Sequence, residues 1–252
     1  DCVEAQLRDM VTRFSGDPTH RQTLLRFYLS RQNFDGAEAF LRELIAEADP
    51  EATEPTLDLI RFLTELRGPD EARAEIERAI AENPAPNRFK AILAMLDFQA
   101  GQQDQAIAEM ESILSGADIT ETETQDIQIT LGRMLVGTGN QVGARRLVEE
   151  VLAQNASNVE ALKMQVSWQL QADETDAAIA NLRIALDTAP DDVQVMNLTY
   201  EAYTRLGEAD LAREYLAQAV EASGNAPEPS LRYARVLMSE ELYLPAEDVL
   251  LP

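Results

Sequence analysis

The residues that most often perform chemistry in proteins are sparse in this sequence. His20 is the only histidine and Cys2 the only cysteine. A multi-histidine metal site, or acid–base catalysis by histidine, needs partners that a single histidine does not have. We therefore interpret His20 as an incidental surface or capping residue. A lone cysteine also excludes an internal disulfide.

Cys2 has two interpretations. It is either the lipidated N-terminal cysteine of a truncated lipoprotein or an incidental free thiol. The apolar stretch that precedes a lipidation site is not in the sequence, so the free thiol is favoured.

Two further patterns superficially suggest a phosphate-binding loop and a catalytic pair of carboxylates. The segment GTGNQVG, residues 137–143, looks like a glycine-rich phosphate loop, but such a loop follows a strand, and this one follows a predicted helix. Neighbouring carboxylates such as Glu149 and Glu150 need a dry pocket to act as acid and base. We predict no catalytic residue, no metal ligand and no cofactor, and we expect no enzyme activity.

Composition narrows the class of protein. The chain has 252 residues, 45% of them hydrophobic, so it can bury a sizeable core. No apolar run approaches the roughly 18 residues of a membrane-spanning helix. The net charge of -24 repels phosphate backbones and argues against nucleic acid as a partner.

One pattern repeats along almost the whole chain. Seven alanines recur at spacings of 35, 34, 38, 34, 34 and 34 residues, and a large apolar residue follows each of them four positions later. The alanines are Ala37, Ala72, Ala106, Ala144, Ala178, Ala212 and Ala246. The large residues are Leu41, Ile76, Met110, Val148, Leu182, Leu216 and Leu250. Such spacing marks one face of a helix that a neighbouring helix approaches closely.

A second helix precedes each of these alanines. Leu24, Leu59, Leu93 and Leu131 lie thirteen residues before an alanine. Gly68, Gly101, Gly139 and Gly207 lie between the two helices and supply the backbone freedom of a tight turn. Every unit is therefore predicted to be helix, turn, helix, turn.

These residues resemble the tetratricopeptide repeat family. Leu131, Gly132, Leu135, Gly139, Ala144 and Val148 follow its consensus, as do Tyr203, Leu206, Gly207, Ala212, Leu216 and Ala219. The resemblance implies an all-α solenoid with a right-handed superhelical twist. It departs at Gln165 and Thr199, where the family has a large apolar residue, so looser or rotated helix interfaces are expected there.

The resemblance gives a repeat frame for one solenoid domain over 1–252. Residues 1–17 form a lone helix, complete repeats occupy 18–52, 53–86, 87–124, 125–158, 159–192 and 193–226, and 227–252 is a partial repeat. The chain thus begins and ends inside a repeat, which indicates a segment of a longer protein or ends that associate with another copy. The connection 115–124 is the longest, and we expect a solvated loop there.

Charge on the expected groove is the most informative functional pattern. The resemblance places the second, fifth, ninth, twelfth and thirteenth residues of each repeat on the concave surface. These positions sum to +1, against -25 for the remaining residues. The basic and apolar residues predicted to bind a ligand there are Arg26, Arg61, Arg133, Lys163, Arg205, Arg235, Leu57, Ile129, Leu231 and Met238.

The arginines among them have two interpretations. Their planar forks suit carboxylate or phosphate recognition. Alternatively, they pair with acidic residues of neighbouring helices. The family's carboxylate clamp, with lysine at the fifth position and asparagine at the ninth, is not found in the pairs Gln22 and Arg26, Leu57 and Arg61, or Ile129 and Arg133. Trp168, the only tryptophan, is expected to pack between repeats rather than anchor a ligand.

The resemblance implies a protein-binding scaffold whose partner is a peptide or protein segment, acidic if the arginines face it. Similar acidic, alanine-rich proteins and lipoproteins serve bacterial envelope, exopolysaccharide and export systems, which slightly favours a periplasmic location. The alternative is an accessory domain of a larger enzyme. Self-association through the repeat ends is a third option.

Overall fold

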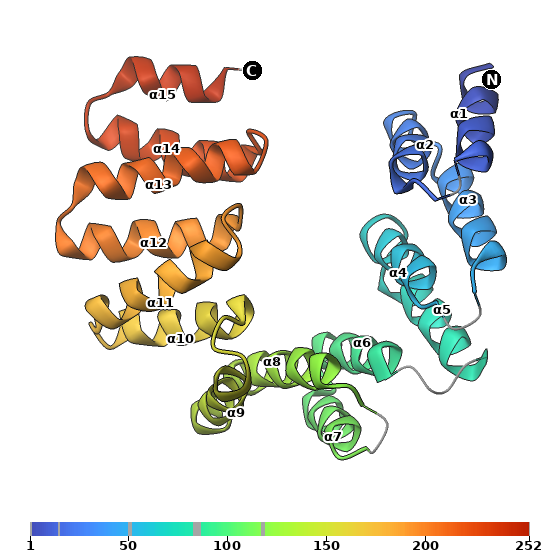
Figure 1. Ribbon diagram of the computed structural model, residues 1–252, viewed down its shortest axis with the longest axis horizontal. Coiled ribbons are helices and arrows are strands. Elements are labelled where there is room, and N and C mark those ends of the chain that lie inside the picture. Colours follow the sequence, from blue (N-terminus) through green and yellow to red (C-terminus); the bar gives the residue numbers. More distant parts are fainter. Residues whose placement is uncertain (1, 15, 50–51, 83–86, 117–118, 252) are drawn as a thin grey trace. The chain divides into compact units, whose positions relative to one another are not determined.

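A computed structural model describes residues 2–14, 16–49, 52–82, 87–116 and 119–251. All regular secondary structure in these ranges is helical, as predicted, and the helices form two compact units, residues 1–119 and 120–252 (Figure 1). The first unit contains α1 (Cys2–Arg13), α2 (Pro18–Ser30), α3 (Phe34–Glu47), α4 (Glu54–Leu66), α5 (Pro69–Glu82), α6 (Asn87–Gln99) and α7 (Gln103–Leu114).

The second unit contains α8 (Glu121–Gly137), α9 (Gln141–Gln154), α10 (Val159–Gln171), α11 (Thr175–Thr188), α12 (Val193–Leu206), α13 (Ala209–Ala222), α14 (Pro227–Ser239) and α15 (Tyr243–Leu250). In both units, consecutive helices pack against each other along the chain. The even-numbered helices are the first helices of the predicted repeats, and the odd-numbered helices from α3 onward are the second.

The periodic alanines lie at the closest contacts between helices. All seven are at most 3% exposed, and the large apolar residues four positions later are buried up to Leu216. Leu250, the last of that series, is 45% exposed because α15 ends there. The predicted buried face of the second helices is therefore confirmed.

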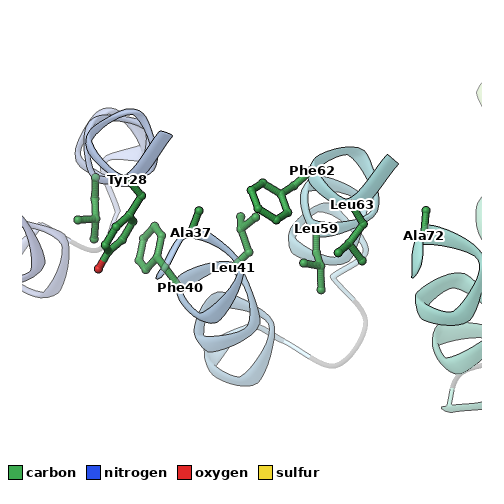
Figure 2. Packing of buried hydrophobic residues seen from close by; sticks show 9 residues of the cluster. Tyr28, Ala37, Phe40, Leu41, Leu59, Phe62, Leu63 and Ala72 are labelled. Carbon is green, nitrogen blue, oxygen red and sulfur yellow. The ribbon is translucent and has the colours of Figure 1, made fainter. Parts of the chain in front are cut away.

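The core of the first unit shows how one second helix is held between two first helices. Ala37, Phe40 and Leu41 of α3 lie between Tyr28 of α2 and the Leu59 side of α4 (Figure 2). Tyr28 also ties α1 to this cluster, since its hydroxyl donates to Glu4 at 2.6 Å. Burial of a large side chain contributes roughly 1.5–3 kcal/mol, so these layers dominate the stability of the fold.

The turns inside the repeats share one backbone conformation. Gly68, Gly101, Gly139 and Gly207 all have positive φ, between 78° and 117°. The same place in the other repeats is occupied by Gln32, Asp173 and Glu241, with φ of 54°, 58° and 62°. Glycine therefore occupies four of these turns, as predicted, whereas the other three place a non-glycine residue in the left-handed region at a steric cost.

The connection 115–124 is only partly a loop. Thr120 caps α8, because its hydroxyl accepts from the Glu123 N–H at 3.3 Å while the Glu123 carboxylate accepts from the Thr120 N–H at 3.0 Å. Residues 121–124 are therefore the first turn of α8 rather than loop, and residues 117–118 lie outside the described ranges. The Thr-x-x-Glu signature of a capping box is present in the sequence.

The two polar departures from the repeat pattern are satisfied by hydrogen bonds. Thr199 is 2% exposed, and its hydroxyl donates to the Val195 carbonyl at 2.8 Å. Gln165 accepts a hydrogen bond from the Asn181 side chain at 2.9 Å. The Thr199 hydrogen bond lies within α12, whereas the Gln165 hydrogen bond joins α10 to α11, so the polar group is paired at both positions.

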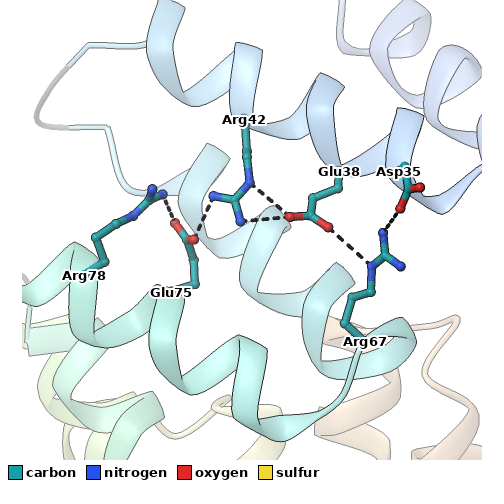
Figure 3. A network of polar contacts seen from close by, with 6 residues as sticks. All are labelled: Asp35, Glu38, Arg42, Arg67, Glu75 and Arg78. Carbon is teal, nitrogen blue, oxygen red and sulfur yellow. Dashed lines mark hydrogen bonds and ion pairs between the residues drawn. The ribbon is translucent and has the colours of Figure 1, made fainter.

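An ion-pair network joins two repeats of the first unit. Glu75 of α5 is 6% exposed and accepts from Arg42 of α3 at 2.9 Å, while its other oxygen pairs with Arg78 (Figure 3). Arg42 also binds Glu38, whose second oxygen accepts from Arg67 at 3.3 Å. Arg42 and Arg67 thus join α3 to α5 and to the end of α4, and Arg78 pairs with Glu75 within α5.

Enlarging a periodic alanine tests the packing. We expect Ala178→Leu to lower the free energy of unfolding by about 1–3 kcal/mol, because the added atoms must displace neighbouring helices. Ala180→Leu, on the exposed side of the same helix, should change it by less than about 0.5 kcal/mol. Urea denaturation measures both, and equal effects would contradict the packing described.

Glycine substitution at a residue with left-handed backbone conformation tests the turns. Gln32→Gly should raise the free energy of unfolding by about 0.5–1 kcal/mol, since glycine adopts positive φ without the steric cost. Gln22→Gly, in the exposed face of α2, should lower it by a similar amount, because glycine disfavours a helix interior. The two variants should move the melting temperature in opposite directions.

Candidate functional site

The first helices of four repeats in the second unit together line one open groove of about 450 Å³. Met164 of α10 and Leu198 of α12 supply its apolar surface. Its polar lining comes from α8, α10, α12 and α14, in the residues Arg133, Lys163, Ser167, Gln194, Asn197, Glu201 and Arg232. The repeat brings these side chains together because every first helix presents the same face to this side.

One end of the groove carries a chain of alternating charges. Arg133 pairs with one oxygen of Glu160, and Lys163 binds the other oxygen at 2.5 Å. Lys163 continues the chain to Asp192 at 3.0 Å and to the Gln194 side-chain oxygen at 3.0 Å, and only 11% of its side chain is exposed. Two predicted ligand cations are therefore neutralised by acidic residues of the protein itself.

Asp192 both binds Lys163 in this series of ion pairs and caps the N-terminus of α12. Burial alone would raise the pKa of Asp192, but the Val195 N–H and the Lys163 ammonium outweigh it and hold the pKa below the usual value of 3.8. The same carboxylate accepts from the N–H groups of Gln194 and Val195 at 2.8 and 2.9 Å. Lys163 is thereby tied to the N-terminus of α12.

The lining from α12 and α14 includes a buried acceptor without a hydrogen bond and an arginine without an ion pair among the described residues. The Asn197 Oδ1 atom is buried and accepts no hydrogen bond from any described residue. Arg232 makes no ion pair within the described ranges, and its guanidinium lies 5.8 Å from the centre of the Tyr200 ring. Arg235, one turn further along α14, is exposed and likewise has no ion pair among those residues.

The other predicted site residues are dispersed. Arg205 is occupied by Asp173 at 3.1 Å, by Glu201 at 2.9 Å and by the Leu170 carbonyl. Arg61 pairs with Asp58 of its own helix at 3.2 Å, whereas Arg26 is exposed and pairs with no residue in the described part of the chain. Both arginines belong to the first unit.

The four predicted apolar contacts divide into two kinds. Leu57 and Ile129 are 7% and 3% exposed, so their side chains belong to the core rather than to an accessible surface. Leu231 and Met238 of α14 are about half exposed. They lie on the same helix as Arg232 and Arg235.

Sequence reasoning missed several groove residues. Asn197 occupies a fifth position of the repeat, one of the positions assigned to the groove, but its lack of charge hid it. Arg232 occupies a sixth position, outside that set, and reaches the groove because α14 places it beside Tyr200. Met164 and Leu198 likewise lie at sixth positions.

The remaining candidates behave as structural residues. Trp168 is 9% exposed, and Arg145 of the preceding α9 lies 5.2 Å from its ring, as expected for packing between repeats. The segment 137–143 is the turn between α8 and α9, where Asn140 caps α9. The described residues contain no cluster of three metal-ligating side chains, and no helix in them is long and apolar enough to cross a membrane.

The chain belongs to the tetratricopeptide repeat family. Two family models, both described as tetratricopeptide repeat, match residues 28–96 and 164–227, which together make up just over half of the chain. A comparison with curated proteins finds no match.

Solved structures of tetratricopeptide proteins share the fold. The APC/C hetero-tetramer Cut9–Hcn1 aligns with a TM-score of 0.62 and 16% identity over 98% of this chain and 51% of that chain. TTC0263, a thermophilic TPR protein of Thermus thermophilus, aligns with a TM-score of 0.57 and 22% identity, over 74% of this chain and 100% of that chain. PilW, a type IV pilus biogenesis factor, aligns with a TM-score of 0.56 and 19% identity, over 82% of this chain and 93% of that chain. At these identities the likeness shows the fold alone.

The depressed pKa of Asp192 gives a pH-dependent prediction. Asp192→Asn keeps an N-cap but removes the charge that binds Lys163, so it should lower the free energy of unfolding at pH 7 by about 0.5–1 kcal/mol. A carboxyl whose pKa falls on folding contributes stability above its unfolded value and loses it as the pH drops. The deficit should therefore begin to shrink near pH 3.8 and continue to shrink as the pH falls through the lower pKa of the folded state.

Urea denaturation between pH 3 and pH 7 measures this deficit. Asp191→Asn is the matched control, because Asp191 is exposed and makes no ion pair within the described ranges. A deficit that stays constant with pH would contradict the role assigned to the Asp192 charge.

Proposed function

We propose that this protein is a non-catalytic protein–protein interaction scaffold and that the groove of the second unit binds a peptide or protein segment of the partner. The observation that carries the proposal is the groove of about 450 Å³, with apolar surface from Met164 and Leu198 and polar groups from four successive first helices. A surface lined by successive repeats suits an elongated ligand, because each repeat contributes one set of contacts along its length.

The groove has the mixed lining that recognition of a protein segment requires. Apolar side chains supply most of the binding free energy, and placed polar groups fix the register of the ligand. The predicted ligand residues in the second unit that are exposed and make no ion pair with a described residue are Arg235, Leu231 and Met238, and all three lie on α14, which also contributes Arg232. Arg133, Lys163 and Arg205 pair with acidic residues of the protein, and the first two line the groove.

A role in a bacterial envelope or export system is part of this proposal. The similarity to PilW, whose description names type IV pilus biogenesis, supports it only at the level of the fold. The alternative function is an accessory repeat domain of a larger enzyme. The full-length gene separates them, since a signal peptide and lipidation site favour the first and an adjoining catalytic domain favours the second.

Filling the groove tests the proposal. Ser167 lines the groove at a half-buried position, so Ser167→Tyr should occupy it without removing a core side chain. A displayed library of random ten-residue peptides is selected on the wild-type chain. We expect the enriched peptides to bind Ser167→Tyr at least about tenfold more weakly, a loss of about 1.4 kcal/mol.

Ala180→Tyr is the matched control, because it adds the same side chain to the exposed face of α11. Fluorescence anisotropy measures the affinities, and thermal melting confirms that both variants fold. The proposal would be wrong if no peptide were enriched, or if the enriched peptides bound both variants with the wild-type affinity.

A further inference from the structure

We infer that Asn197 and Arg232 of the proposed groove, together with the exposed Arg235 one turn further along α14, form the recognition site, and that its ligand is an extended acidic segment with carboxylate side chains at alternate positions. The inference rests on the proposed function and identifies the chemistry of the segment. None of these residues is needed by the ion pairs that hold the repeats together.

The other cations of the groove are unsuited to a ligand. Arg133 and Lys163 share the carboxylate of Glu160, and Lys163 also binds Asp192. A ligand carboxylate would have to displace these internal partners, and the exchange of one ion pair for another yields little net free energy. A cation that makes no internal ion pair can bind a ligand carboxylate without this exchange.

Arg232 and Arg235 meet that condition. They lie three residues apart on α14 and make no ion pair with any described residue, in a chain of net charge -24 with 45 acidic residues. Their guanidinium groups are therefore available to a ligand carboxylate. Each planar guanidinium can bind both oxygens of one carboxylate.

The two separate guanidinium groups match two carboxylate side chains of a ligand better than the single carboxylate at a peptide C-terminus. Three residues of helix advance about 4.5 Å, and alternate residues of an extended segment are about 6.6 Å apart, a difference that arginine side chains readily span. The half-exposed Leu231 and Met238 lie on the same helix and offer apolar contact to residues that flank this pair. The matching pattern is therefore acidic, any residue, acidic.

Asn197 indicates an extended rather than a helical ligand. Its side-chain amide makes no hydrogen bond within the described part of the chain, and its buried oxygen lacks a donor. A primary amide complements a peptide unit, because it donates to a carbonyl and, once rotation of the amide turns its oxygen toward the groove, accepts from an N–H. An extended main chain has both groups available, whereas a helix uses them internally.

The peptides enriched on the wild-type chain supply the test. The favoured peptide is synthesised with a blocked N-terminus, once as the C-terminal amide and once as the free acid. We expect two Asp or Glu residues separated by one position and equal affinity of the two forms. Arg232→Gln with Arg235→Gln should weaken binding about ten- to a hundredfold. Arg183→Gln, an exposed site on α11, should leave it unchanged.

Asn197→Leu separates recognition from folding. It removes an amide that makes no internal hydrogen bond, so the melting temperature should stay equal or rise while the affinity falls about tenfold. A drop in melting temperature would assign Asn197 to the fold and overturn its role in binding.

Other outcomes overturn the inference while leaving the proposed function intact. These are enriched peptides that lose affinity for Ser167→Tyr yet lack acidic residues, acidic peptides insensitive to the double arginine variant, and peptides that require a free C-terminal carboxylate. If no enriched peptide responds to Ser167→Tyr, the proposed function itself fails.

Discussion

Each second helix in this protein is approached so closely by its neighbours that only a methyl group fits at one position per repeat. Ala37, Ala144 and Ala178 are completely buried at such contacts. The close approach lets the flanking large residues interdigitate, and the buried layers then orient every first helix in the same way. The groove follows from this constraint, because four first helices can line one surface only if their repeats are in register.

The same constraint explains how much of the fold can be predicted from the sequence. Helix-period spacing of small and large apolar residues is a local signal, so the helices and their buried faces were predictable from single residues such as Ala178 and Leu182. The turns were predictable only where glycine marks them. Gln32, Asp173 and Glu241 adopt the same backbone, because packing on either side imposes a conformation that their residue types disfavour.

The candidate site was less predictable, since it depends on which charges meet in space. Arg133 and Arg235 occupy equivalent positions in their repeats, yet Arg133 is paired with Glu160 and Arg235 has no ion pair within the described residues. Periodicity gives the direction of a side chain but not the length and charge of what lies opposite. Asn197 carries no charge and therefore escapes any search for basic positions, although its burial without a partner sets it apart.

The acidic composition of the chain bears on how the arginines without ion pairs are interpreted. With 45 acidic residues against 21 basic ones, most arginines find a carboxylate nearby, as Arg42, Arg67 and Arg78 do in the network of the first unit (Figure 3). Such pairs hold repeats together at positions where apolar packing alone leaves the surface open. An arginine without an ion pair in these surroundings can still receive a carboxylate from outside the fold. Arg232 lines a groove of mixed apolar and polar character that also holds the unsatisfied Asn197 oxygen, and Arg235 lies one turn away on the same helix. A partner's acidic side chains are therefore the charges best able to pair with them.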